Sequence, residues 1–227
     1  MALLRIIRST PTWAVVDKPP GLLSVPGKGP DKQDCVPARI RAMFPSATGP
    51  IVVHRLDMDT SGLLVVGLTP DAQRTLSAQF EARTVAKRYE ALVMGRLSDE
   101  ATLAGDDQGW WTIDFPIRPD LDNRPWQIHD PVHGRRAVTR VCVIERDTDR
   151  TRLELEPVTG RAHQLRVHCA FAPPLGLGHP ILGDVLYGPE PTVAAGGAPR
   201  LMLHAKRLAF DDPDSGERVE VMSEPGF

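Results

Sequence analysis

The stretch HRLDMDTSGLLVVGLTPDAQ, residues His54–Gln73, places a polar loop, an apolar segment and a helix start in direct succession. Leu63–Leu68 is short, apolar and rich in branched side chains, which predicts a buried strand. Thr69–Asp71 supplies an N-cap, a proline at the first helical position and an acid in the first turn, so a helix is expected to about Arg83. The loop His54–Gly62 should therefore form a turn at the mouth of a sheet.

The remaining elements follow from apolar periodicity and from the prolines and glycines that separate short segments. Seven further strands are expected: Leu3–Ile7, Trp13–Asp17, Val85–Val93, Ala137–Ile144, Arg152–Glu156, Leu201–Phe210 and Arg218–Met222. Two further helices are expected at Val36–Phe44 and Arg161–Phe171, and irregular segments at 24–34, 99–112, 119–134 and 188–199. Strands outnumber helices and most of them are not joined by regular helical crossovers, which favours an α+β fold with a mixed or antiparallel sheet.

Length and composition are those of an ordinary globular protein, with 227 residues, 41% of them hydrophobic and 25% charged. The longest apolar run, Leu63–Leu68, is far shorter than the roughly 20 residues of a membrane-spanning helix. Arg5 and Arg8 interrupt the N-terminal apolar residues before a signal-peptide core can form. The three cysteines contain no C-x-x-C pair, so neither a disulfide framework nor a thiolate zinc site is indicated. We expect a cytoplasmic protein.

The net charge of −2 hides an uneven distribution. Residues 97–130 carry −6 and residues 211–224 carry −5, which leaves +9 for the rest of the chain. Basic side chains concentrate in 83–96, 135–152 and 161–166. If these segments meet in space they form a face for a polyanion. The alternative is that they are solvated strand faces, and the alternating charges in 145–156 favour that reading there.

The loop HRLDMDTSG (His54–Gly62) is the densest group of polar residues in the chain. Asp, Thr and Ser all bond to local backbone in turns, so the loop can be purely structural. Alternatively, one carboxylate points into a pocket. Asp59, followed by Thr-Ser-Gly, has the character of a turn residue, whereas Asp57 after Leu56 is the better candidate for a positioned carboxylate.

Two other segments carry candidate residues. In TGRAHQLRVH (Thr159–His168), the two histidines are five residues apart and no acid separates them, which does not fit a helical zinc site. Arg166 is better read as a buried or phosphate-facing guanidinium. In KRYEALVMG (Lys87–Gly95), Tyr89 shares a strand face with Ala91 and is either a core residue or a functional one.

Several enzyme classes are disfavoured by the absence of their motifs. A Ser-His-Asp hydrolase would show a G-x-S-x-G elbow. The glycines of VPGKGP do not form a phosphate loop, and no dinucleotide fingerprint is present. Chemistry without a cofactor is therefore favoured.

Taken together, these segments resemble the RluA family of RNA pseudouridine synthases. The matching motifs fall in the family's order: VDKPPGLLSVPG (Val16–Gly27), HRLDMDTSG (His54–Gly62), KRYEALVMG (Lys87–Gly95), TGRAHQLRVH (Thr159–His168), GHPILGDVLYG (Gly178–Gly188) and LMLHAKRL (Leu201–Leu208). The segments LLSVPG and DNRP and the short length are most similar to the founding member. Many relatives carry an N-terminal S4 domain, but here the motifs begin by residue 16, so we expect a single catalytic domain over 1–227 without one.

The resemblance implies a pseudouridine-synthase α+β fold, in which a mixed, largely antiparallel sheet crosses two lobes with an active cleft between them. It implies isomerisation of uridines in structured RNA, either 23S rRNA, a tRNA anticodon stem-loop or both. The N1–C1′ bond breaks, the uracil turns, and C5 joins C1′. It implies no metal, nucleotide or redox cofactor and no membrane. A monomer is the default expectation.

The resemblance also assigns roles to individual residues. Asp57 takes the place of the catalytic aspartate, acting as nucleophile or base. Three routes stay open: attack on the sugar, attack on the base, and a glycal route. Arg166 matches the arginine that pairs with this aspartate and keeps it ionised. Tyr89 matches an active-site tyrosine that stacks on uracil and assists loss of the C5 proton. Leu203 is an apolar wall of the pocket.

A target base in a stem-loop must leave its stack to reach the carboxylate. Arg55 is placed to fill the vacated gap. Phosphate contacts are expected from basic side chains near the motifs. These are His54, Arg83, Lys87, Arg88 and Arg161.

Two other hypotheses compete with that of a synthase. An RNA-binding protein that has lost catalysis is disfavoured, because it need not keep Asp57, Tyr89 and Arg166 together. A small-molecule hydrolase lacks its motifs. Residues 104–112 form a longer acidic segment than the subgroup usually has, and 126–134 lack its lysines. Both segments are expected to contact RNA outside the pocket. They therefore affect which uridine is the target and not which reaction is catalysed.

Overall fold

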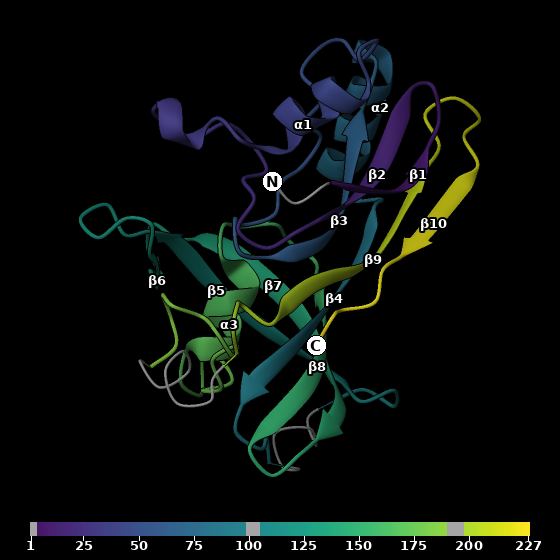
Figure 1. Cartoon of the computed structure of the whole chain (residues 1–227). Coiled ribbons are helices and arrows are strands. Elements are labelled where there is room, and N and C mark those ends of the chain that lie inside the picture. The colour runs from purple at the N-terminus through teal and green to yellow at the C-terminus, as the bar shows by residue number, and fades with distance from the viewer. Residues whose placement is uncertain (1–3, 99–104, 190–197) are drawn as a thin grey trace. The chain divides into compact units, whose positions relative to one another are not determined.

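The computed structural model describes residues 4–98, 105–189 and 198–227 (Figure 1). The backbone packs as two compact units. The first, here called the terminal unit, comprises Met1–Lys87 and His204–Phe227, and the second, the central unit, comprises Arg88–Leu203. The chain leaves the terminal unit within β4 (Ala86–Met94) and returns to it at the start of β9 (Leu203–Asp211).

The terminal unit contains strands in the order β1-β2-β3-β9, with β10 paired to β9. The pairing of β3 with β9 is parallel and the other pairings are antiparallel. The elements not yet bounded are β1 (Arg5–Ser9), β2 (Trp13–Lys18), η1 (Pro30–Lys32), α1 (Val36–Met43), β3 (Ser61–Gly67), α2 (Pro70–Ala82) and β10 (Arg218–Met222).

The core of the terminal unit lies between its sheet and α2. Trp13 on β2 meets Phe210 on β9 edge to face, with ring centroids 5.1 Å apart. Leu76 of α2 is fully buried in the same cluster as Leu63 of β3, so the helix covers that face of the strand. The predicted N-cap is confirmed, because Thr69 Oγ1 accepts a hydrogen bond from the Ala72 N–H at 3.3 Å.

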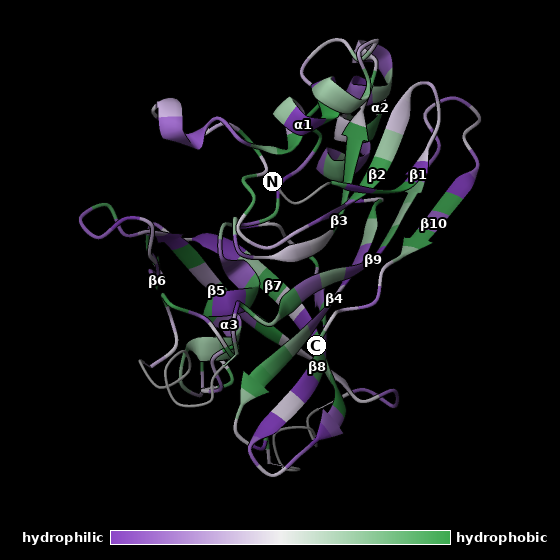
Figure 2. Ribbon diagram, in the orientation of Figure 1, coloured by the Kyte–Doolittle hydropathy of each residue, from purple (hydrophilic) through white to green (hydrophobic). Residues whose placement is uncertain are grey.

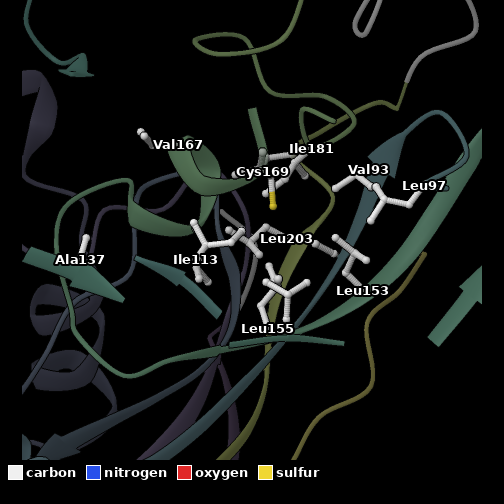
Figure 3. Close-up of a cluster of buried hydrophobic side chains, with 14 of the residues drawn as sticks. Val93, Leu97, Ile113, Ala137, Leu153, Leu155, Val167, Cys169, Ile181 and Leu203 are labelled. Atoms are coloured by element: carbon white, nitrogen blue, oxygen red, sulfur yellow. The ribbon is translucent and has the colours of Figure 1, made fainter. Parts of the chain in front are cut away.

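The central unit is an antiparallel sheet in the order β4-β8-β7-β5-β6, with one helix. Its remaining elements are β5 (Trp110–Pro119), β6 (Gln127–His129), β7 (Arg135–Arg146), β8 (Arg150–Pro157) and α3 (Gln164–Ala170). Hydrophilic and hydrophobic residues alternate along β8 (Figure 2). The apolar face packs against α3, and Figure 3 shows Leu153 and Leu155 in one cluster with Cys169 of the helix. The alternation thus places one face of the sheet in the core.

The α+β class and the mixed, largely antiparallel sheet are confirmed, and each expected strand and helix is present. The expectation of irregular structure is wrong for parts of three segments: η1 lies within 24–34, β5 begins within 99–112, and β6 lies within 119–134. Ile113, Phe115 and Ile117 alternate inward along β5, but the surrounding acids, glycines and prolines concealed this period. The predictions for Leu3, for 99–104 and for 190–197 concern residues outside those that the structure describes.

Helix α3 is shorter than expected because it begins at Gln164 instead of Arg161. His163 adopts the left-handed conformation, with φ of 52°, which a helix cannot include. In the described part of the chain, no helix is both long and apolar enough to cross a bilayer.

Candidate active site

The loop that leads into β3 is clamped on both sides of Asp57. Before it, Ser24 Oγ donates to the Leu56 carbonyl at 2.7 Å and accepts from the Leu56 N–H at 3.0 Å. After it, the Thr60 N–H donates to the Asp57 carbonyl at 3.2 Å, which closes a turn. Asp57 is half-buried, and among the described residues of the terminal unit no group donates a hydrogen bond to its carboxylate. The loop therefore presents a carboxylate on a rigid backbone.

A buried lysine holds the next residue of the loop. Lys18 is 0% exposed, and its Nζ donates to the Met58 carbonyl at 2.8 Å. It also donates to the carbonyls of Pro19 and Leu22, so its three ammonium hydrogens match three acceptors. Burial lowers the pKa of Lys18 to about 7, while the nearby carboxylates of Asp57 and Asp59 act in the opposite direction. The KPPG segment thus anchors the loop beneath Asp57.

The TSG end of the loop, Thr60–Gly62, contacts β9 through a side-chain hydrogen bond and close backbone packing. Ser61 Oγ lies 2.9 Å from His204 Nδ1, and His204 Nε2 lies 3.1 Å from the Ser223 carbonyl. Because only Nε2–H can donate to that carbonyl, Nδ1 accepts from the Ser61 hydroxyl. Gly62 has φ of 110°, and a Cβ there would lie 2.5 Å from the Ala205 backbone. The small residue lets β3 and β9 pair directly after the loop.

His54 is placed as a structural residue at the start of the loop. Its Nε2 accepts a hydrogen bond from the Val65 N–H at 3.1 Å, and its ring stacks on Phe80 with centroids 4.2 Å apart. Burial lowers the pKa of His54 from 6.5 to about 3, and the Lys87 charge adds to this. The neutral His54 ring therefore stabilises the loop by accepting a hydrogen bond from a backbone N–H. Its predicted contact with phosphate stays a prediction.

Lowering the pH from 7 to 5 is expected to reduce the free energy of unfolding by about 1–2 kcal/mol through His54. The unfolded chain takes up a proton near pH 6.5, whereas the folded chain does so only near pH 3. The stability due to the neutral ring is therefore complete above pH 6.5 and declines as the pH falls. His168, buried with a pKa lowered by burial to about 4, adds a similar loss.

Urea unfolding at both pH values measures this effect. His54→Gln keeps an acceptor for the backbone N–H but cannot titrate, so its loss of stability should be about 1–2 kcal/mol smaller than that of the wild type. His133, which is exposed, provides the matched control, and His133→Gln should behave like the wild type. Equal pH dependence in His54→Gln and the wild type would contradict the assignment.

In the central unit, Arg166 forms a fully buried ion pair with Asp184. Nε donates to Asp184 Oδ2 at 2.8 Å and Nη2 donates to Oδ1 at 2.6 Å, with the side chains 3% and 0% exposed. Asp184 also accepts from the N–H groups of Leu186 and Tyr187. The bidentate geometry fixes the plane of the guanidinium through its Nε and Nη2 edge.

The GRAHQLRVH segment folds so that Arg166 points into the central unit. Gln164, the first residue of α3, accepts from Thr159 Oγ1 at 2.8 Å and donates to the Val138 carbonyl at 2.9 Å, which ties the helix to β7. The left-handed turn at His163 brings its Nδ1 to 2.9 Å from Tyr187 Oη. These hydrogen bonds stabilise the strained backbone conformation of His163.

Tyr89 and Leu203 border the same hydrophobic cluster as α3. Tyr89 pairs with Leu155 across β4 and β8 and is half-buried against the cluster, while Leu203 is 2% exposed within it. Leu165 and Val167 of α3 belong to this cluster as well. The predicted residues Tyr89, Arg166 and Leu203 thus share the central unit, and Asp57 belongs to the terminal unit.

Two of the predicted RNA contacts are engaged within the central unit. Arg88 lies 3.2 Å from a Glu156 oxygen and 4.2 Å from the Trp110 ring. Arg161 Nε donates to the Arg136 carbonyl at 3.1 Å. By contrast, Arg55 and Arg83 are exposed, and Lys87 is half-buried with a pKa that burial and Arg83 lower. Arg55 and Arg83 are therefore the most accessible of the predicted contacts.

The basic segment 135–152 is largely neutralised by acids on neighbouring strands and turns. The ion pairs are Arg136–Asp114, Arg140–Asp106, Arg140–Glu156, Arg150–Asp147 and Arg152–Glu90. This favours the reading of these residues as paired strand faces over that of a continuous basic surface.

Neither Asp184 nor Lys18 was predicted from the sequence as a site residue. Asp184 lies in GHPILGDVLYG, where an acid flanked by Gly and turn residues was the available signal. Lys18 lies in KPPG, a short motif of low specificity. Both are charged side chains in segments otherwise rich in apolar and turn residues, a pattern typical of a buried charge whose hydrogen bonds are made within the protein.

A family model described as RNA pseudouridylate synthase matches residues 12–171. The Yersinia pestis protein named dual-specificity RNA pseudouridine synthase RluA is 45% identical over 215 residues, covering 94% of this chain and 95% of its own. The proteins of the same name from Haemophilus influenzae and Escherichia coli K12 are 40% and 43% identical. They cover 99% and 94% of this chain, and 94% and 89% of their own lengths.

Two solved structures have a fold similar to that of this chain. Human RNA pseudouridylate synthase domain containing 1 aligns with a TM-score of 0.75 at 29% identity, over 99% of this chain and 84% of that one. Human RNA pseudouridylate synthase domain containing 4 aligns with a TM-score of 0.73 at 24% identity, over 97% of this chain and 88% of that one.

Proposed function

The chain belongs to the RNA pseudouridylate synthase family, and we propose that it isomerises uridines in both 23S rRNA and a tRNA anticodon stem-loop, with Asp57 as the catalytic carboxylate. Membership makes it an RNA pseudouridine synthase. The dual specificity in the names of relatives that match almost the whole chain supports two classes of RNA.

The observation that carries the proposal is the clamped loop around Asp57. Ser24 holds the residue before it and Lys18 holds the residue after it. The half-buried carboxylate has no donor among the described residues of its own unit. A carboxylate on an immobilised backbone suits a nucleophile or base that must meet a flipped nucleotide at a set distance.

The reaction conserves all atoms of the nucleotide. The N1–C1′ bond breaks, the uracil turns and the C5–C1′ bond forms, while C5 loses a proton and N1 gains one. Asp57 acts by attack on C1′, by attack on the base, or as a base in a glycal route. Each route requires the ionised carboxylate.

We assign to Arg166 the charge partner of Asp57 in the RNA complex. Asp184 orients the guanidinium through Nε and Nη2, and a cation close to a carboxylate favours its ionised form. Tyr89 stacks on the uracil and assists removal of the C5 proton, and Leu203 forms an apolar wall.

The target uridine leaves its stack to react, and we propose that exposed Arg55 fills the gap. Arg83 contacts the RNA backbone, together with His54, Lys87, Arg88 and Arg161 where RNA binding makes them accessible. We place the reaction in the cytoplasm, carried out by a monomer without metal or cofactor.

Incubation with anticodon stem-loops and 23S rRNA fragments, followed by chemical mapping of pseudouridine, tests this function. Pseudouridine in both RNAs supports dual specificity. Pseudouridine in one of the two RNAs restricts the proposed substrate to that class of RNA. Pseudouridine mapping of cellular RNA with and without the gene then identifies the target positions. Binding of both RNAs without any product would favour the non-catalytic RNA-binding alternative.

A further inference from the structure

Trp126 is the one exposed aromatic side chain in the described part of the chain, with 41% of its surface accessible. It ends the loop that joins β5 to β6 (Figure 1). The other three tryptophans are buried or half-buried. Tryptophan has an apolar body and a polar N–H, and it is enriched where proteins contact other molecules.

Both the backbone and the ring of Trp126 are held in place. Its N–H donates to the Asn123 carbonyl at 3.0 Å, and its carbonyl accepts from the Asp120 N–H at 2.9 Å. The ring packs edge to face on Tyr187, with centroids 5.3 Å apart and planes at 73°. Asp120 further stabilises the loop by accepting from the N–H groups of Asp122 and Asn123. A ring ordered in this way loses little entropy when a ligand binds.

Tyr187 connects Trp126 to the candidate active site. The Tyr187 ring lies 5.3 Å from Cζ of Arg166, and its hydroxyl accepts from the Gln127 N–H at 2.8 Å. Trp126 is therefore two ring contacts away from the guanidinium of Arg166, and all of these residues belong to the central unit. A nucleotide next to one bound near Arg166 would fall within reach of the tryptophan.

We propose that Trp126 is a stacking platform for an unpaired RNA base close to the target uridine, an inference that rests on the proposed function. Proteins read single-stranded loops by stacking splayed bases on aromatic rings. The loop itself is not basic, since its one basic residue, Arg124, is outnumbered by Asp120 and Asp122. The contact therefore depends on the ring face and not on phosphate attraction.

Binding of anticodon stem-loop RNA, measured by fluorescence anisotropy, tests the platform. Trp126→Ala should weaken the affinity about 5- to 100-fold, and Trp126→Phe should recover most of it. The matched control is Leu121→Ala, which removes another exposed apolar side chain of the same loop and should leave the affinity within twofold. Because stacking is not ionic, the ratio between Trp126→Ala and wild-type affinity should change little with salt, although both affinities fall.

A series of RNAs, each lacking one loop base, separates stacking from a structural effect. At the position that stacks, removal of the base should bring wild type and Trp126→Ala to the same affinity, within twofold. Equal loss for Trp126→Ala on every RNA in the series, or no loss on any of them, would overturn the inference. These measurements need binding only, so they remain decisive even if no pseudouridine forms, which would instead refute the proposed function.

Discussion

Asp57→Ala is expected to reduce pseudouridine formation at least about a thousandfold while RNA binding largely survives. The alanine leaves the clamped loop intact, because Ser24 and Lys18 hold it through backbone groups of Leu56 and Met58. What disappears is the carboxylate that every one of the three routes requires. Single-turnover release of tritium from RNA labelled at uridine C5 measures the chemistry, since C5 loses its hydrogen when it joins C1′.

Asp59→Ala is the matched control, since it removes the same chemical group two residues further along the same loop. We expect it to keep its activity within about tenfold of the wild type, because Asp59 is assigned to the turn. Wild-type turnover by Asp57→Ala, or loss of activity confined to Asp59→Ala, would refute the site assignment. Urea unfolding of both variants verifies that the loop substitutions leave the fold intact.

Arg166→Met is expected to lower both stability and activity. It leaves Asp184 as an unpaired charge in a fully buried position, which costs about 3–5 kcal/mol in free energy of unfolding. It also removes the proposed charge partner of Asp57, so turnover should fall about a hundredfold or more. The stability loss by itself could explain lower activity, so a second variant is needed.

The double variant Arg166→Met with Asp184→Asn separates the two effects. Asparagine keeps an oxygen for the Leu186 and Tyr187 N–H groups but carries no charge, so most of the lost stability should return. The activity should not return, because no cation remains to pair with Asp57. Recovery of activity together with stability would show that Arg166 is purely structural. Urea unfolding and single-turnover kinetics on the same preparations give the answer.

Local sequence patterns predicted most of the fold. Leu63–Gly67 lies in β3 and Arg218–Met222 is β10, and the N-cap at Thr69 begins α2 as expected, because these features depend on residues within a few positions of one another. Strand β5 was missed because its inward alternation lies among prolines and charges. The start of α3 was misplaced because the left-handed turn at His163 is supported by a contact with distant Tyr187.

The sequence predicted the motif residues of the candidate site better than it predicted the basic face. Family motifs singled out Asp57, Tyr89 and Arg166, and the structure places the last two in one unit beside a common core. The expected basic face was predicted less well. Arg88 and Arg140 lie beside the same Glu156, a pairing across strands that no local pattern reports.

The sequence by itself determined the family and the reaction and predicted Asp57 as the reactive carboxylate, because these inferences depend on residue types at short, ordered spacings. The tertiary structure decided how those residues are held. Lys18 reaches the carbonyl of Met58, and Arg166 is paired with Asp184, only after chain folding. A buried charge can find its partner anywhere in the chain, and low exposure makes that pairing obligatory. For that reason the partners, and the exposed position of Trp126 on Tyr187, had to come from the fold.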